Sequence, residues 1–249
     1  MEIKYFVLNI LGRLRQIQFL RKAFGSIYRT FHKDKSVEKV RELSENFKAN
    51  GLTVLQKFDS MMNENGYKYS LAFGTMLGAV REKGFIKHDA DIDVFMWIDD
   101  YNPEFLTCIK RYGFKLMHTF SVDGDKYGKE DAIMMDGVQI DIFYIYPALE
   151  GRTCPYSCDF VIHPDCLSRE HAVHKHGGLL PRRIEVPMSN EIIRTPFESL
   201  SLPILKNAEE FLSQRYGSNY MIPDPNWSSG PNPNIIPWTD KVAVFKILE

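Results

Sequence analysis

The stretch that decides the fold reads SLAFGTMLGAVREKGFIKHDADID, residues 70–93. Residues 69–73 are short and mostly apolar, which predicts a strand. Gly74 ends this run and allows a tight turn, and the residues up to Lys83 favour a helix. The sequence therefore predicts a strand, a turn and a helix in direct succession.

A second strand is expected over residues 91–97, and closely spaced acidic residues mark its beginning. Side chains alternate between the two faces of a strand, so Asp91 and Asp93 point the same way, and Asp89 joins them if the strand begins that early. Neighbouring carboxylates repel each other unless a cation lies between them. Mg²⁺ binds one or two carboxylates together with phosphate oxygens and water. This pattern indicates a site for a metal ion and a phosphate.

Two further features favour the same chemistry. Gly74 and Thr75 stand where a helix begins, and the free N–H groups of a helix N-terminus bind anions. Asp141 lies in the run 138–146, which is otherwise rich in β-branched and aromatic residues, so its carboxylate needs a cation or a proton donor. An Asp-x-Asp pair alone is more often the solvated face of an edge strand. The combination of all these features favours a functional site.

The rest of the chain predicts an α+β fold with a mixed sheet flanked by helices. Asp136-Gly137 is a strong hairpin signal that joins two strands, and no elements are placed in the irregular region 147–203. The other expected elements are helices over 36–65, 102–112 and 205–216, strands over 114–120, 132–135 and 138–146, and an extended loop over 222–238.

Composition limits the classes of function. The chain has 249 residues, of which 44% are hydrophobic and 25% charged, as in a globular protein with a sizeable core. The net charge of −1 offers no general attraction to nucleic acid, so no nucleic-acid partner is expected.

Residues 1–35 are expected to form a basic amphipathic helix, separate from a catalytic domain over 36–249. Residues 1–40 hold nine basic and three acidic side chains, and the apolar positions recur every three or four residues. Residues 1–34 could contact a membrane surface, pack on the domain or pair with another subunit. No secretory signal or apolar run of about 18 residues is recognised, so the expected location is the cytoplasm, at the inner face of the cell membrane.

Three of the four cysteines lie close to a histidine in the spacing Cys154-x3-Cys158-x4-His163-x2-Cys166. These are ligand types of a structural Zn²⁺ site, but the spacing is irregular. Reduced thiols without a metal are favoured over structural zinc.

Several of these motifs together resemble the LicD and fukutin family. They are Gly74-Thr-Met-Leu-Gly-Ala-Val-Arg81, Gly84-Phe-Ile86, Asp89-x-Asp-Ile-Asp93 and Ile140-Asp-Ile-Phe143. The resemblance implies a nucleotidyltransferase-like fold. It also implies transfer of a phosphorylated alcohol from a CDP-activated donor to a sugar hydroxyl. The chain departs from the family at Lys87-His-Asp-Ala90, where Pro-Trp-Asp-Asp is frequent, so pocket shape and donor choice are less defined.

The resemblance implies a role for each matching residue. Asp91 and Asp93, with Asp89, would hold Mg²⁺, for which Mn²⁺ is an alternative. Asp141 would complete the metal site or accept the proton of the attacking hydroxyl. Four further positions would serve the phosphates: Gly74 and Thr75 as a cradle, with Lys83 and Lys87 as lesser candidates. Arg81 would neutralise charge on the transferred phosphoryl group.

The expected function is a Mg²⁺-dependent phosphotransferase that moves a phosphocholine-type group to a cell-surface glycan such as lipopolysaccharide, teichoic acid or capsule. The expected partners are the nucleotide-activated donor and a glycan or lipid-linked glycan acceptor. Two alternatives stay open: a nucleotidyltransferase that makes an activated donor, and a non-catalytic membrane-associated scaffold. The complete acidic set argues against the scaffold.

Overall fold

The computed structural model describes residues 44–87, 89–224 and 232–247. The amphipathic helix expected over 1–35, and with it the domain boundary at that point, lies outside the described residues. Within the described part of the chain, no helix combines the length and the apolar content needed to cross a membrane.

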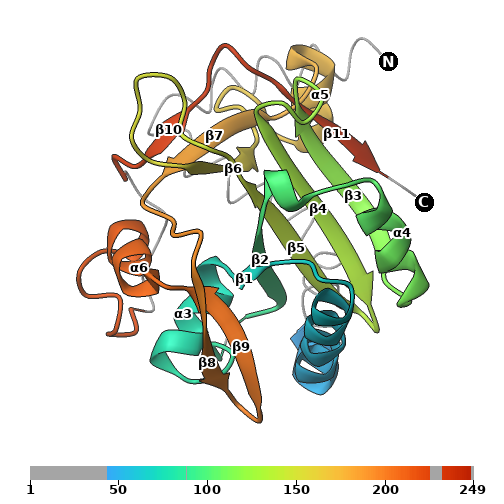
Figure 1. Ribbon diagram of the computed structural model, residues 1–249. Helices are drawn as coiled ribbons and strands as arrows, with labels where there is room; N and C mark the ends of the chain where they lie inside the picture. Colours follow the sequence, from blue (N-terminus) through green and yellow to red (C-terminus); the bar gives the residue numbers. More distant parts are fainter. Residues whose placement is uncertain (1–43, 88, 225–231, 248–249) are drawn as a thin grey trace.

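A six-stranded mixed sheet forms the centre of the protein, in the order β1-β2-β5-β4-β3-β11 (Figure 1). The strands β2 and β5 are parallel and every other neighbouring pair is antiparallel. The expectation of a mixed sheet flanked by helices is therefore confirmed. The strand bounds are β1 Ser70–Leu71, β2 Asp91–Trp97, β3 Lys115–Val122, β4 Gly128–Met135, β5 Val138–Ile145 and β11 Ala243–Ile247.

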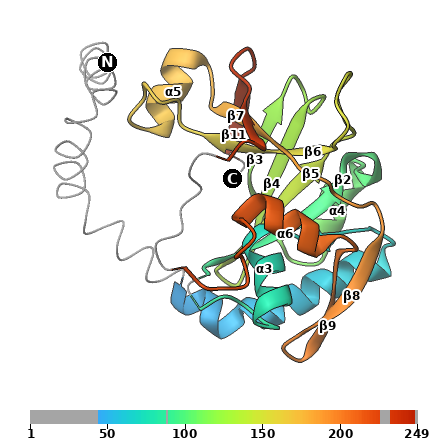
Figure 2. The same cartoon turned by 90° about the vertical axis from the view of Figure 1, so that its left-hand side faces the viewer.

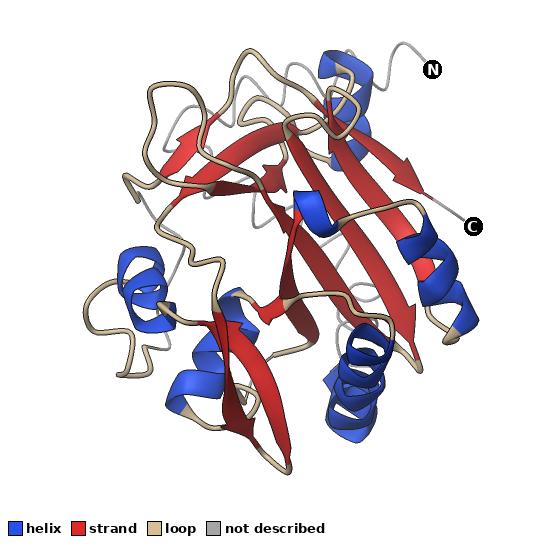
Figure 3. Ribbon diagram, viewed as in Figure 1, coloured by secondary structure: helices blue, strands red, loops and turns tan. Residues whose placement is uncertain are grey.

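Helices cover both faces of this sheet (Figures 1 and 3). On one face, the Phe73 ring at the start of α3 (Phe73–Arg81) contacts Phe95 and Phe143, and Phe211 of α6 (Ala208–Tyr216) contacts Phe95. Figure 2 shows α6 in front of the sheet, with α3 beneath it. On the other face, Tyr101 bridges Tyr144 of β5 and the helix α4 (Glu104–Arg111). A helix over residues 44–64 adds the buried Phe58, Met61 and Met62 to the core.

The hairpin between β4 and β5 turns at Asp136 and Gly137, as the sequence predicts. Both residues have positive φ, 51° and 76°, which is the conformation of a type I′ turn. β4 begins at Gly128, four residues earlier than the expected 132. The prediction was wrong here because Lys129, Glu130 and Asp131 suggest a solvated loop, whereas all three side chains are buried in the strand.

The first strand and the following helix also differ from expectation. β1 comprises only Ser70 and Leu71, and α3 begins at Phe73, so Gly74 lies in the first turn of the helix and not before it. Similarly, α6 begins at Ala208 and not at residue 205, because Leu205 is the last residue of β9.

The region 147–203, where the sequence placed no elements, folds into short strands and one helix. β6 and β7 form a small sheet with β10, and β8 pairs with β9 in a hairpin. The strands β7, β8 and β9 each contain a proline, which is uncommon inside a strand, so the sequence pattern does not indicate them. The bounds are β6 Tyr156–Val161, α5 Arg169–His176, β7 Leu180–Glu185, β8 Ile192–Phe197, β9 Leu200–Leu205 and β10 Ile235–Pro237, with a 3₁₀ helix η1 at Ile98–Asp100.

Candidate active site

Three carboxylates from two neighbouring strands meet on the face of the sheet that α3 covers. Asp91 and Asp93 come from β2 and Asp141 from β5, and one oxygen of each lies within 4.8 Å of the others. The parallel pairing of β2 with β5 explains this, because it sets Asp93 opposite Asp141. Asp91 is two residues before Asp93 and therefore faces the same side. The structure thus brings together three of the four acidic residues that the sequence selects.

Hydrogen bonds from neighbouring groups position these carboxylates. The Gly74 N–H donates to Oδ2 of Asp93 at 3.3 Å, and the Asp93 N–H donates to Oγ1 of Thr75 at 2.9 Å. The Gln139 side-chain amide donates to both oxygens of Asp141, at 2.9 and 3.0 Å. The start of α3 is therefore connected directly to the acidic strand.

Asp89 lies beside this cluster, on the other side of Gly74. A Cβ at Gly74 would lie 3.6 Å from oxygens of both Asp89 and Asp93, so glycine leaves the space between the two carboxylates open. The N–H of Ile86 donates to Asp89 at 3.3 Å. Asp89 faces the cluster, but it is not one of the three residues whose carboxylate oxygens lie within 4.8 Å of one another.

The carboxylates repel one another strongly in the absence of a cation. Burial raises the pKa of Asp141 to about 7, and the charge of Asp91 adds to this. Burial raises the pKa of Asp89 to about 6. Desolvation raises the pKa of Asp93 well above its usual range, and the charges of the other three carboxylates raise it further. Such shifts mark a site where protons or cations compensate negative charge.

The geometry suits a hard divalent cation. Three carboxylate oxygens converge, and the donors that reach them, one backbone N–H and the Gln139 amide, are neutral. Carboxylate oxygens are the ligands that Mg²⁺ and Mn²⁺ accept. Asp91, Asp93 and Asp141 therefore fit such an ion, and Asp91, whose side chain reaches solvent, leaves the site open to a ligand.

Residues 66–174 contain all of these groups, and they match the family model described as LicD/FKTN/FKRP, nucleotidyltransferase domain. This segment belongs to the LicD and fukutin family.

The similarity to named proteins extends beyond this segment. Ribitol-5-phosphate transferase FKTN of Mus musculus is 24% identical over 213 residues, covering 80% of this chain and 41% of that protein. The Homo sapiens protein of that name is 23% identical over 246 residues, covering 93% and 47%. Lipopolysaccharide cholinephosphotransferase LicD of Haemophilus influenzae is 46% identical over 50 residues, covering 20% and 19%. The chain thus spans about half the length of the fukutins.

The basic residues implied by the LicD family lie around the site but not in the carboxylate cluster. Arg81 ends α3, binds Glu82 at 2.8 Å and donates to the Tyr220 carbonyl at 3.2 Å. Its charge opposes the rise in the pKa of Asp89, so the two groups are electrostatically linked. Lys83 and Lys87 are exposed, and the Lys83 ammonium donates to the Val80 carbonyl. No hydrogen bond or ion pair between described residues joins either lysine to the carboxylates, and their role stays a prediction.

The two residues expected to cradle phosphate, Gly74 and Thr75, also contact the acidic strand. The Gly74 N–H is directed at Asp93, and the Thr75 hydroxyl, in a side chain that is 1% exposed, accepts from the Asp93 backbone. Both residues therefore position the acidic strand. Any phosphate would use the remaining N–H groups in the first turn of α3.

Three polar residues beside Asp141 were missed from the sequence. Gln139 binds Asp141 directly. Glu130 of β4 and His118 of β3 place ligand atoms within 4.8 Å of Asp141. The Gln139-x-Asp141 alternation was a usable signal, because both side chains share one face. Glu130 and His118 gave no local signal, since only strand pairing brings them to this point.

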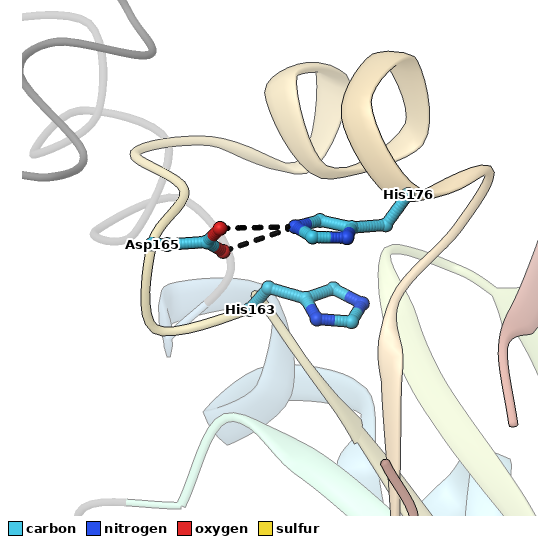
Figure 4. Close-up of side chains that lie close together, drawn as sticks. All are labelled: His163, Asp165 and His176. Atoms are coloured by element: carbon cyan, nitrogen blue, oxygen red, sulfur yellow. Dashed lines mark hydrogen bonds and ion pairs between the residues drawn. The ribbon is translucent and has the colours of Figure 1, made fainter. Parts of the chain in front are cut away.

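The region with the expected Cys and His ligands contains a different cluster. His163, Asp165 and His176 lie together (Figure 4), and the two imidazole rings stack with centroids 4.0 Å apart. Asp165 accepts from Lys175 at 2.7 Å and is 3.0 Å from Nε2 of His176. Positive partners therefore already compensate Asp165. Structural zinc stays the less favoured interpretation, with Cys158 and Cys166 as buried thiols outside any disulfide.

Proposed function

We propose that this protein is a Mg²⁺-dependent phosphotransferase that moves a phosphorylated alcohol from a CDP-activated donor to a sugar hydroxyl of a cell-surface glycan. The observation that carries the proposal is the convergence of Asp91, Asp93 and Asp141 beside the start of α3, within a LicD-family segment. The names of the relatives support the reaction class, because they describe transferases of ribitol 5-phosphate and of phosphocholine.

The three carboxylates would hold the cation, which when bound would neutralise the donor diphosphate and the charge that develops in the transition state. The rest of the chain prepares this site. Gln139 fixes the orientation of Asp141 through two hydrogen bonds, and Thr75 fixes the backbone of Asp93. Such preorganisation avoids the cost of arranging the ligands during the reaction.

Arg81 would supply positive charge at the phosphoryl group that is transferred. Its side chain is 11% exposed and is held between Glu82 and the Tyr220 carbonyl, so its guanidinium is positioned before a substrate arrives. A buried, oriented guanidinium binds phosphate oxygens more strongly than an exposed lysine does. Asp141 would complete the metal site, or accept the hydroxyl proton as a base.

The experiment that tests this function is incubation of the full chain with CDP-choline or CDP-ribitol, Mg²⁺ and a glycan acceptor. We expect CMP release that depends on Mg²⁺ and on acceptor, and that is lost in Asp93→Asn. CMP release that Asp93→Asn leaves unchanged would exclude the carboxylate site as its source. No release from any CDP-linked donor would reject the proposed reaction.

A nucleotidyltransferase that makes an activated donor is the second candidate, because the matching family model is described as a nucleotidyltransferase domain. It would use the same acidic residues. Pyrophosphate release from CTP and an alcohol phosphate would identify this reaction, whereas a phosphotransferase releases CMP and no pyrophosphate.

The acceptor and the location are further parts of the proposal. A lipid-linked glycan would place the enzyme at the inner face of the cell membrane, and the basic, amphipathic residues 1–34 would hold it there. Co-sedimentation with anionic liposomes tests this contact. Binding that is unchanged in a chain lacking residues 1–34 would exclude it.

A further inference from the structure

A second group of ligand atoms adjoins the three aspartates. His118 of β3, Glu130 of β4 and Asp141 of β5 each place one ligand atom within 4.8 Å of the others. Asp141 thus belongs to both groups, with Asp91 and Asp93 on one side and His118 and Glu130 on the other.

Strand pairing explains how these residues meet. Across the sheet, Asp141 lies opposite Ala132, and Ala132 lies opposite His118. The small side chain of Ala132 leaves space between the carboxylate and the imidazole. Glu130 is two residues before Ala132 and therefore points to the same face.

A β-bulge in β3 directs His118 to this face. The register shifts between Leu116, which pairs with Ile133, and His118, which pairs with Ala132. Without the extra residue His118 would lie opposite Asp131, and its side chain would point to the other face of the sheet. Bulges often redirect a side chain at a functional site.

The carboxylate of Glu130 is buried, and the charge of Arg169 acts on it without forming an ion pair. Its side chain is 8% exposed, and no hydrogen bond or ion pair with another described residue reaches its carboxylate. The adjacent buried pair shows the contrast, because Lys129 binds Asp131 at 3.1 Å on the opposite face. A buried carboxylate without a hydrogen-bond or ion-pair partner is unfavourable unless a cation or a proton compensates its charge. The position of Glu130 therefore favours binding of a cation or a proton.

Two aromatic neighbours hold the His118 ring in place. Its ring packs against Phe120 and Phe245, with centroids 5.3 Å away in both cases. A ring nitrogen of His118 lies within 4.8 Å of carboxylate oxygens of Glu130 and Asp141, and imidazole nitrogen is a common metal ligand.

We propose that His118, Glu130 and Asp141 form a second divalent-cation site that shares Asp141 with the Asp91, Asp93 and Asp141 site. A ligand set of one imidazole and two carboxylates suits Mn²⁺ or Zn²⁺ better than Mg²⁺, which prefers oxygen ligands alone. The proposal rests on the proposed function only through the shared Asp141. Two ions that share a carboxylate lie about 4 Å apart in proteins, and such pairs clamp transferring phosphoryl groups.

The test is Mn²⁺ binding to the full chain, followed by electron paramagnetic resonance and by counting bound ions at equilibrium. A His176→Ala background removes the histidine pair at His163, so that only ions at the sheet are counted. We expect two Mn²⁺ per chain with a spin-coupled spectrum. Glu130→Gln and His118→Ala should each retain one ion, lose the coupling and weaken the second ion at least about tenfold.

The outcomes separate this proposal from the proposed function. One bound ion that is lost in Asp91→Asn and is unaffected by Glu130→Gln would overturn the second site while supporting the first. No Mn²⁺ at the sheet would overturn both. Glu130→Gln preserves side-chain volume. A melting temperature equal to or above that of the parent protein shows that the variant is folded. Loss of an ion in this variant would then reflect the lost carboxylate ligand.

Discussion

Asp93 lies directly opposite Asp141 in the parallel pair of β2 and β5. Two residues 48 positions apart in the chain therefore share one row of the sheet, where the charge of Asp141 helps to raise the pKa of Asp93. This relationship determines both the stability of the metal-free protein and the chemistry that the site can perform.

Asp93→Asn should remove activity and stabilise the metal-free protein. The change preserves volume but removes the charge that three other carboxylates oppose. We expect CMP release to fall at least about 100-fold and the metal-free unfolding free energy to rise by about 1 kcal/mol or more. Thermal unfolding in EDTA measures the second effect. Asp240→Asn, at an exposed position, is the matched control and should change neither quantity. A metal-free Asp93→Asn protein less stable than wild type would contradict the repulsion.

The stability of the metal-free protein should depend on pH through Asp141 and Asp89. In the folded state their pKa values are about 7 and about 6, above the unfolded value of 3.8. At pH values between 3.8 and these pKa values, the folded state therefore binds more protons than the unfolded state. These two groups therefore favour folding at low pH, and their contribution is lost as pH rises from about 4 to about 7.

This pH effect is measured by unfolding at pH 5 and pH 7.5 in EDTA. Asp141→Asn should gain more stability over wild type at pH 7.5 than at pH 5. Saturating Mg²⁺ should stabilise wild type more at pH 7.5, because the cation needs ionised ligands. An equal effect of Asp141→Asn at both pH values would show that Asp141 does not titrate in this range.

Thr75→Val should destabilise the protein and weaken the site. It removes the oxygen that accepts from the Asp93 N–H at 2.9 Å, in a side chain that is 1% exposed. A buried N–H without a partner costs about 1–3 kcal/mol. Denaturant unfolding measures this cost. Thr75→Ser keeps the hydroxyl and should retain most of the stability, so similar losses in both variants would assign the effect to packing alone.

Gly78→Ala should disrupt the packing of residues 84–86 against α3. A Cβ at this position would lie 2.4 Å from the Gly84 carbonyl oxygen and 3.3 Å from the Ile86 nitrogen. The backbone must move, at a cost of about 1–3 kcal/mol, and the segment that leads to Asp89 would shift with it. Gly51→Ala is the matched control, since its Cβ would meet the Phe85 ring at an ordinary 3.5 Å. A melting temperature unchanged by Gly78→Ala would contradict this role.

Local sequence patterns predicted several of the elements that surround the site. The bounds of β2, 91–97, agree with the structure, because an apolar run that starts with alternating acids has a clear strand period. The hairpin at Asp136-Gly137 also agrees, because a type I′ turn depends on the φ preferences of two adjacent residues. The grouping of Asp91 and Asp93 follows from alternation along one strand.

Tertiary pairing decided the remainder. Asp141 meets Asp93 only because β5 inserts beside β2, and His118 reaches the same face only through a bulge in β3. The charged start of β4 is buried by its neighbours and not by its own pattern. Local sequence alone predicts the grouping of the acids of β2, the hairpin turn and the strand periods, since these depend on residues a few positions apart. The complete ligand set depends on contacts between distant strands, whose register is chosen by the packing of the whole sheet.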